Sequence, residues 1–261
     1  MLIKKKSIEK KQSLRTSRKA RFVPVNLSEE NGIRYLHFGT QWIQGAMRLR
    51  KPYWLELEYV QQMMTWMLFL EQPEHIVQLG LGTAALTKFC HRHFPTTHVT
   101  AIELNPTVIA VCYSMFMLPL NDDYLHVVEM DAMDFVTDFA HHGKIDVLQV
   151  DLYDATAEGP VLDSPEFYLA CAACLKPGGV MTVNLFGDHP SYERNLKAMR
   201  FAFDTVFCLP ELGAGNVIAI AFKESLRLDF RVLHKKAVYI SSTTELPASS
   251  WVKGLKVTQP D

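Results

Sequence analysis

Residues 75–104 read HIVQLGLGTAALTKFCHRHFPTTHVTAIEL, and they determine how the rest of the chain is interpreted. A short apolar run at 76–79 leads into Gly80 and Gly82, and a helical pattern follows. A second apolar run at 98–102 ends at Glu103, 21 positions beyond Gly82. A strand, a glycine turn, a helix, a strand and an acidic residue in this order are typical of a nucleotide-binding βαβ unit.

Each part of this unit has a chemical use. Glycine has no Cβ, so Gly80 and Gly82 let the backbone pass close to a ligand. The Glu103 carboxylate can accept hydrogen bonds from both hydroxyls of a ribose. The turn lacks the third glycine of a dinucleotide fingerprint and continues with the small Ala84, which favours a mononucleoside or an S-adenosyl ligand. The alternative is a turn that only closes a corner between strand and helix.

Strand and helix patterns alternate after this unit. Because such alternation builds a parallel sheet that is covered on both faces, we expect an α/β fold. The expected sheet is Rossmann-like and of the methyltransferase type, with seven strands that are mostly parallel and an antiparallel hairpin at its end. A helix is expected at 55–70, before the unit. The later strands are expected at 125–129, 145–150, 180–186, 205–209 and 217–222, and the later helices at 106–117, 131–141, 164–175 and 190–203.

The sequence divides into four parts. Residues 1–21 are a basic tail expected to be disordered, because they have almost no large apolar side chains. Residues 22–52 contain short β-rich segments and form a small N-terminal β domain, which is too small to stand alone. Residues 53–240 are expected to form a Rossmann-like catalytic domain, and residues 241–261 are expected to be a C-terminal tail.

The charge is unevenly distributed along the 261 residues. Of the 27 Lys and Arg residues nine lie in the first 21 positions, beside one of the 28 acidic residues. The remaining chain therefore has 18 basic and 27 acidic residues, a net charge of −9. An acidic body is compatible with a cationic substrate. The basic tail could contact nucleic acid or a membrane surface, but a solvated tail is the preferred interpretation.

Composition also limits the location. No apolar run approaches the ~18 residues that a membrane span needs, and the N-terminus lacks the apolar segment of a secretory signal. Five cysteines, an odd number, indicate reduced thiols and a cytoplasmic protein. Cys171 and Cys174 are expected to be buried helix residues rather than a redox pair. The histidines form no cluster with carboxylates, so no metal is expected.

Acidic residues follow several of the expected strands. Asp131 comes after the third strand, and Asp151 and Asp154 come after the fourth. In open α/β sheets the ligand binds at the carboxyl ends of the strands, so these side chains should lie with Glu103 near the ligand. Asp131 could accept a hydrogen bond from an adenine amino group, cap the next helix, or do both. Asp151 and Asp154 could converge on one cation, and the alternative is two solvated acids.

At these positions the chain resembles the polyamine aminopropyltransferase family, the spermidine synthases and their relatives. The resemblance covers about residues 30–222 and includes the glycine turn, the acidic strand ends, the Lys-Pro-Gly-Gly turn at 176–179 and a tyrosine after the small β domain. It implies a catalytic set of Asp151, Asp154 and Tyr59. It implies a binding set for the nucleoside ligand of Gln44, Gly80, Gly82, Thr83, Glu103, Asp131 and Ala132.

The resemblance also implies a reaction. An aminopropyl group would pass from decarboxylated S-adenosylmethionine to a polyamine-like amine, with release of methylthioadenosine, in a homodimer without a metal. Thr83 and Gln61 stand where the family has acidic residues, so the amine pocket is expected to be altered. Two alternatives stay open: a methyltransferase that uses S-adenosylmethionine itself, and a non-catalytic member that only binds a nucleoside.

Overall fold

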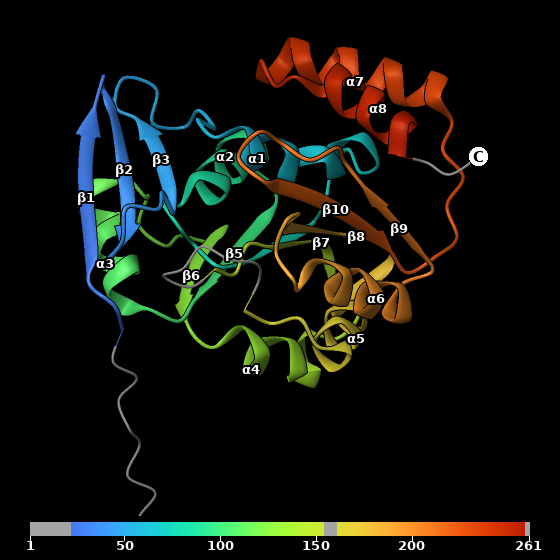
Figure 1. The fold of residues 1–261 in the computed structure, drawn as a ribbon, viewed down its shortest axis with the longest axis horizontal. Coiled ribbons are helices and arrows are strands. Elements are labelled where there is room, and N and C mark those ends of the chain that lie inside the picture. Colours follow the sequence, from blue (N-terminus) through green and yellow to red (C-terminus); the bar gives the residue numbers. More distant parts are fainter. Residues whose placement is uncertain (1–21, 154–160, 259–261) are drawn as a thin grey trace, which may run out of the picture.

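The computed structural model describes residues 22–153 and 161–258. Two sheets and the helices around them make up this part of the chain (Figure 1). Two predictions fall outside the described residues: the disordered basic tail at 1–21, and the catalytic role of Asp154.

The central sheet has seven strands in the order β6-β5-β4-β7-β8-β10-β9. Strand β10 runs antiparallel to both β8 and β9, and the pairs that join β6, β5, β4, β7 and β8 are parallel. This confirms the predicted mostly parallel sheet with a closing antiparallel hairpin. The strands are β4 His75–Leu79, β5 His98–Glu103, β6 Leu125–Glu129, β7 Ile145–Val150, β8 Leu175–Phe186, β9 Thr205–Cys208 and β10 Asn216–Phe222.

Helices cover both faces of the central sheet, and a separate hydrophobic core lies on each face. Neighbouring residues of β4 show the division, because Ile76 belongs to one core and Val77 to the other. Cys171 and Cys174 are buried in the second core, as predicted. Helices α2 Ala85–His93 and α3 Pro106–Met115 pack on the first core, and α4 Ala132–Thr137, α5 Pro165–Cys174 and α6 Tyr192–Ala202 pack on the second.

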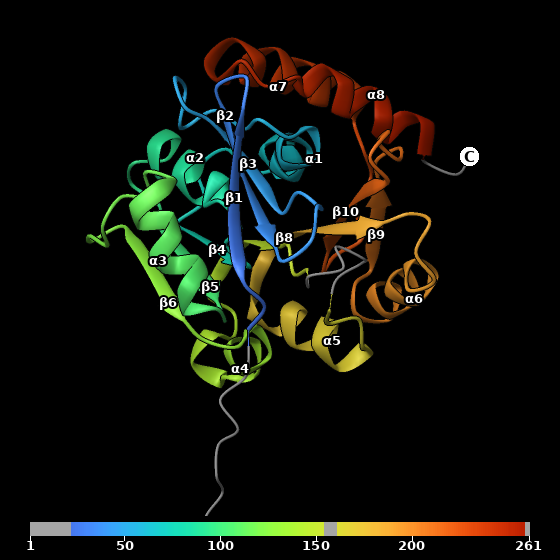
Figure 2. The same cartoon turned by 60° about the vertical axis from the view of Figure 1, so that its left-hand side comes forward.

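The small β domain is a three-stranded antiparallel sheet of β1 Val25–Glu30, β2 Ile33–Phe38 and β3 Gly45–Arg48. It lies beside α2 and α3 in both views (Figures 1 and 2). Arg34 donates a hydrogen bond to the carbonyl of Met115 at the end of α3. At Gly45 an added Cβ would lie 2.6 Å from the Thr83 side chain, so glycine allows the small sheet to approach the glycine turn.

The predicted helix at 55–70 is shorter and changes its type. Helix α1 covers Glu58–Gln62, and a 3₁₀ helix, η1, continues over Met63–Leu68. The carbonyl of Met63 accepts hydrogen bonds from the buried side chains of Gln149 and Thr182, each at 3.2 Å. These tertiary bonds replace the partner that an α-helix would supply, which accounts for the tighter winding.

Residues 241–258 do not form the expected tail. They complete α7, Phe230–Thr244, and form α8, Ala248–Thr258, and the two helices pack against each other above one end of the sheet (Figure 1). Trp251, Val252 and Leu255 of α8 are buried in the first core. Their spacing places them on one helix face, which is the reason this segment folds onto the domain. No helix of the described residues combines the length and the apolar character needed to cross a bilayer.

Candidate active site

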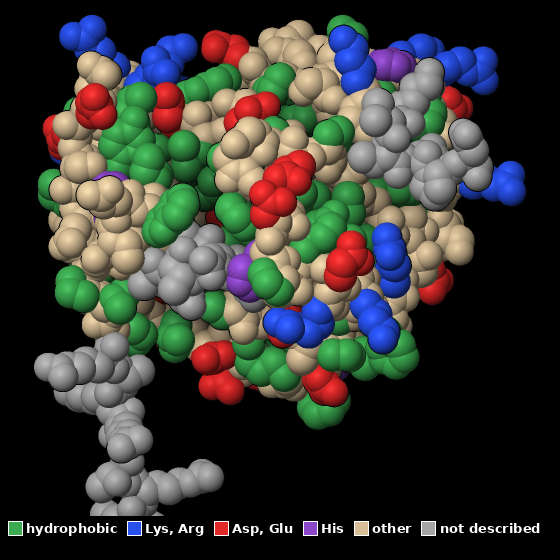
Figure 3. Space-filling model, in the orientation of Figure 1, with side chains coloured by type: hydrophobic (Ala, Val, Ile, Leu, Met, Phe, Trp, Pro, Cys, Tyr) green, Lys and Arg blue, Asp and Glu red, His purple; other side chains and the backbone are tan. Residues whose placement is uncertain are grey.

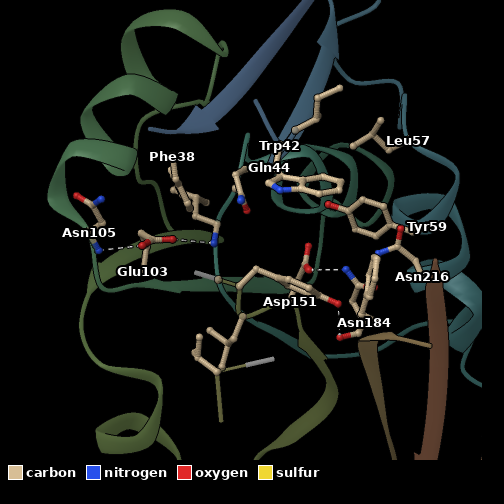
Figure 4. Close-up of a pocket in the computed structure, with 18 of the residues that line it drawn as sticks. Phe38, Trp42, Gln44, Leu57, Tyr59, Glu103, Asn105, Asp151, Asn184 and Asn216 are labelled. Atoms are coloured by element: carbon tan, nitrogen blue, oxygen red, sulfur yellow. Dashed lines mark hydrogen bonds between the residues drawn. The ribbon is translucent and has the colours of Figure 1, made fainter. Parts of the chain in front are cut away.

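A cleft of about 920 Å³ lies where the carboxyl ends of the central parallel strands meet the small sheet. Residues that directly follow β4, β5, β6 and β7 form its floor, and residues from the small sheet and α1 form its roof. Glu103 and Asn105 lie at one end, and Asp151, Asn184, Asn216 and Tyr59 lie at the other (Figure 4). The cleft therefore lies at the edge of the sheet where the sequence rule places a ligand.

The glycine turn is shaped by the neighbouring strand as well as by the cleft. Gly80 has φ +93°, and an added Cβ would lie 2.1 Å from the carbonyl oxygen of Asp151. Its N–H donates to the carbonyl of Ile102 at 2.8 Å, and the N–H of Asp151 donates to the carbonyl of Leu79 at 2.9 Å. Gly82 has φ +54° and also lines the cleft. Close approach of backbone to backbone thus requires glycine at position 80.

Glu103 connects the two loops at its end of the cleft. One carboxylate oxygen accepts a hydrogen bond from the N–H of Leu81 at 3.0 Å, and the other accepts from the N–H of Asn105 at 2.8 Å. Burial raises the pKa of Glu103, and the hydrogen bonds from Asn105 and Leu81 oppose that rise. Because each carboxylate oxygen has two acceptor positions, the group keeps capacity for further donors.

Of the other predicted binding residues, three line the cleft and one does not. Gln44, Asp131 and Ala132 line the cleft. Asp131 also caps α4, because its side chain accepts a hydrogen bond from the N–H of Met133 at 2.7 Å, which is the capping role considered from the sequence.

Thr83 does not lie where a ligand contact was expected. Its side chain is buried, 3% exposed, beneath β3 and is not among the residues that line the cleft. Its hydroxyl donates to the carbonyl of Ala46 at 3.4 Å, and its methyl group fills the space left by Gly45. The structure gives this side chain a packing role between the turn and the small sheet.

The predicted catalytic residues Asp151 and Tyr59 meet at the other end. Asn184 Nδ2 donates to Asp151 Oδ1 at 2.9 Å, and the Tyr59 hydroxyl is also hydrogen-bonded to this carboxylate. Burial raises the pKa of Asp151 to about 6, and the bonds from Asn184 and Tyr59 oppose the rise. The pKa of Tyr59 is raised well above its ordinary value by burial and by the nearby Asp151. A partly buried carboxyl whose pKa is raised to about 6 is suited to general base catalysis.

Sequence analysis missed the polar residues that support Asp151. Asn184 lies in β8, Asn216 begins β10, and Tyr153 follows Asp151 by two residues, and all three line the cleft. Asn184 carried a usable signal, because it is an amide inside the otherwise apolar end of a strand. Asn216 carried none, since its contribution depends on how β8 and β10 pair.

The cleft carries negative charge. Among the described residues that line it, four are acidic and none is Lys, Arg or His; the acids are Glu58, Glu103, Asp131 and Asp151. Acidic and hydrophobic side chains flank the recess beside the small sheet on the face shown in Figure 3. Within residues 22–153 and 161–258, no group of three His, Cys, Asp or Glu side chains is placed to hold a metal ion. The arrangement favours a cationic, partly apolar ligand.

The fold is a Rossmann-like, methyltransferase-type sheet joined to a small β domain, and the cleft lies at the carboxyl ends of its parallel strands. The spermine/spermidine synthase domain matches residues 56–229. The polyamine aminopropyltransferase of Chromobacterium violaceum is 34% identical over 236 residues, 90% of each chain.

Two solved structures are similar in fold. A spermidine synthase in complex with the transition-state analogue AdoDATO has a TM-score of 0.66 at 17% identity and covers 88% of this chain and 84% of its own. Human methyltransferase-like protein 13 in complex with SAH has a TM-score of 0.63 at 22% identity and covers 78% and 94%.

The chain belongs to the spermine/spermidine synthase family, and it is an enzyme of the aminopropyltransferase type. This confirms the resemblance found in the sequence.

Proposed function

We propose that this protein transfers an aminopropyl group from decarboxylated S-adenosylmethionine to a polyamine-like amine and releases methylthioadenosine. The observation that carries the proposal is the pairing of an acidic cleft with a partly buried base. Asp151 has a pKa near neutrality in a cleft whose described lining has no Lys, Arg or His. Both substrates of this reaction are cations, so the same field attracts each of them.

Charge also favours the decarboxylated ligand over S-adenosylmethionine itself. The methionine carboxylate of S-adenosylmethionine would enter a cleft in which the described acids are Glu58, Glu103, Asp131 and Asp151. No described basic side chain lines the cleft to pair with that carboxylate. Like charges that are partly removed from water repel each other strongly, which disfavours the methyltransferase alternative.

The chemistry assigned to the chain is proton removal and alignment. The amine nitrogen attacks the methylene carbon next to the sulfonium, a C–N bond forms, and the C–S bond breaks with its electron pair remaining on sulfur. An ammonium has no lone pair, so Asp151 accepts the amine proton before the nitrogen attacks. Tyr59 and Asn184 hold the carboxylate, and the remaining rate gain comes from keeping nitrogen and carbon in line.

The amine end of the cleft retains acidic character although Thr83 and Gln61 are not acids. The amide of Gln61 donates to the carbonyl of Leu55 at 2.7 Å, so it is engaged in the local backbone. Glu58, one residue before Tyr59, is exposed and lines the cleft, and we assign it the attraction of the distal part of the amine. The role of Asp154 in holding the amine stays a prediction.

Calorimetry tests the ligand part of this proposal. The wild-type protein is titrated with decarboxylated S-adenosylmethionine, S-adenosylmethionine and methylthioadenosine. We expect decarboxylated S-adenosylmethionine to bind at least tenfold more tightly than S-adenosylmethionine. Repulsion of the methionine carboxylate by about 1.4 kcal/mol would change the dissociation constant by a factor of ten. Equal or tighter binding of S-adenosylmethionine would favour the methyltransferase alternative.

We predict that Glu103 binds the ribose hydroxyls of the nucleoside. Glu103→Gln keeps the shape of the side chain but removes its charge, so methylthioadenosine binding should weaken by ~1.5 to 3 kcal/mol, the usual range for hydrogen bonds to a charged group. Glu129→Gln, at the end of β6 and outside the cleft lining, is the matched control and should bind as the wild type does. A folded Glu103→Gln protein with unchanged affinity would remove Glu103 from this role.

We further propose a homodimer that forms near the small sheet and functions in the cytoplasm. The support is the exposed edge strand β1, which pairs with β2 alone among the described residues, together with the small area that this sheet can bury by itself. Light scattering at micromolar concentration should give twice the monomer mass of 29.7 kDa. A monomer under these conditions contradicts the dimer and leaves the reaction itself untouched.

A further inference from the structure

Two asparagine side chains form a chain of hydrogen bonds that ends at Asp151 (Figure 4). Asn216 Nδ2 donates to Asn184 Oδ1 at 3.0 Å, and Asn184 Nδ2 donates to Asp151 Oδ1 at 2.9 Å. The strands β8 and β10, which carry these residues, are antiparallel neighbours. Among the described residues the side-chain donors to the Asp151 carboxylate are Asn184 and Tyr59, so an effect of Asn216 on that carboxylate passes through Asn184.

The direction of the Asn184 amide determines whether it helps or harms Asp151. With its NH₂ toward the carboxylate it donates a charge-assisted hydrogen bond. If the amide were turned over, its oxygen would face the carboxylate and the two acceptors would repel each other. Asn184 is only 2% exposed, so water has little access to compensate for the wrong orientation. When the Asp151 carboxyl is protonated, it can donate a hydrogen bond as well as accept one. In that state Asp151 by itself does not fix the orientation of the Asn184 amide.

Asn216 is itself held in a defined position. It follows Gly215, which has a φ of +87° and packs against the ring of Phe186. A Cβ at position 215 would lie 2.7 Å from that ring, so the turn needs glycine there. The N–H of Gly187 donates to the carbonyl of Gly215 at 2.8 Å. The Tyr153 hydroxyl is hydrogen-bonded to the Asn216 side chain and donates to the carbonyl of Asn184 at 3.1 Å.

We propose that Asn216 is a positioning residue, which holds the Asn184 amide with its NH₂ group toward Asp151 and so keeps that carboxylate ready to accept the amine proton. The orientation of the Asn184 amide is a property of the protein without ligand. The effect on the reaction rate rests on the proposed aminopropyl transfer. The described groups that act on Asp151 are Asn184 from β8, Tyr59 from α1, and burial. Tyr153, from the segment after β7, faces the same network.

The consequence concerns the pKa of Asp151, about 6 in the native arrangement. Burial raises it, and the donor from Asn184 is the first of the two bonds that oppose the rise. Losing the constraint at Asn216 weakens this donor. The pKa of Asp151 should then rise further, by roughly one pH unit if most of a charge-assisted bond is lost. At pH 7 a larger fraction of the protein would then lack the base.

A double-mutant cycle in the full chain tests this. Asn216→Ala, Asn184→Ala and the double variant are prepared, and the titration of the Asp151 carboxyl is followed by ¹³C NMR without any ligand. The resonance is assigned by its loss in Asp151→Asn. We expect each single variant to raise the titration midpoint of Asp151. In the Asn184→Ala background, Asn216→Ala should add little, because Asn216 acts through Asn184. Asn121→Ala, outside the cleft lining, should leave the midpoint unchanged.

The outcomes separate the proposal from its alternatives. An unchanged midpoint in folded Asn216→Ala overturns it, and so does an equal shift in the wild-type and Asn184→Ala backgrounds. If Asn216→Ala fails to fold, Asn216→Ser keeps a small polar side chain that is too short to reach Asn184, and the same shift is expected. If aminopropyl transfer is also detected, the acid limb of the kcat/KM profile should move with the NMR midpoint. If the NMR shifts occur without aminopropyl transfer, the positioning role stands and the proposed function fails.

Discussion

Asp151→Asn is expected to reduce the rate of aminopropyl transfer ~10²- to 10⁴-fold, the usual contribution of a positioned general base. The substitution keeps the shape of the side chain and removes the group that accepts the amine proton. Nucleoside binding should barely change, because Glu103 lies at the other end of the cleft (Figure 4). Single-turnover kinetics with decarboxylated S-adenosylmethionine, together with calorimetry of methylthioadenosine, measure the two effects separately.

The pH profile of the wild type should report the same group. The pKa of Asp151 is raised to about 6, so the carboxyl is protonated and cannot accept a proton below that pH. Activity should therefore fall as the pH decreases through about 6, and this limb should be absent from the residual activity of Asp151→Asn. Asp123→Asn, an exposed carboxylate before β6, is the control and should keep the wild-type profile. Full turnover by Asp151→Asn would leave the reaction standing and remove Asp151 from its role.

Gly80→Ala is expected to damage both stability and binding. A Cβ at this position would lie 2.1 Å from the carbonyl oxygen of Asp151, and the φ of +93° is unfavourable for alanine. Strain of this kind together with a forced shift of packed backbone costs roughly 2 to 6 kcal/mol. The melting temperature should fall by about 5 °C or more for a domain of this size. Methylthioadenosine binding should also weaken, because the displaced turn carries Leu81, whose N–H holds the Glu103 carboxylate.

Gly143→Ala separates the two causes in that experiment. Gly143 also has positive φ, +65°, but an added Cβ meets no atom within 4 Å. Only the backbone strain applies there, about 1 to 2 kcal/mol, and ligand affinity should be unchanged. If Gly80→Ala lost no more stability than Gly143→Ala and bound methylthioadenosine normally, the close approach of the turn to Asp151 would not be important for the site.

The fold was largely predictable because its signals are local. The strands in the βαβ unit, β6 and β7 follow from apolar runs that end in glycine or acidic residues. The position of the cleft was predicted by the rule that ligands bind at the carboxyl ends of parallel strands. The strands end at this edge of the sheet, so Glu103, Asp131 and Asp151 line one cleft. The C-terminal helices could have been predicted as well, since Trp251 and Leu255 have helical spacing.

The details that the sequence did not predict depend on partners that are distant in sequence. The shift from α-helix to 3₁₀ helix after Gln62 follows from side chains of β7 and β8 that bind the Met63 carbonyl. Thr83 turns away from the cleft because Gly45, on another sheet, makes room for it. The link from Asn216 through Asn184 depends on the register of two antiparallel strands. No short motif encodes such contacts.

Mass spectrometry of the products tests the central claim most directly. The wild-type protein is incubated with a short aliphatic diamine and either decarboxylated S-adenosylmethionine or S-adenosylmethionine. With the decarboxylated ligand we predict methylthioadenosine and an acceptor enlarged by one aminopropyl group, both greatly reduced in Asp151→Asn. A methylated acceptor and S-adenosylhomocysteine from S-adenosylmethionine, with no aminopropyl product from the decarboxylated ligand, would contradict the proposed function.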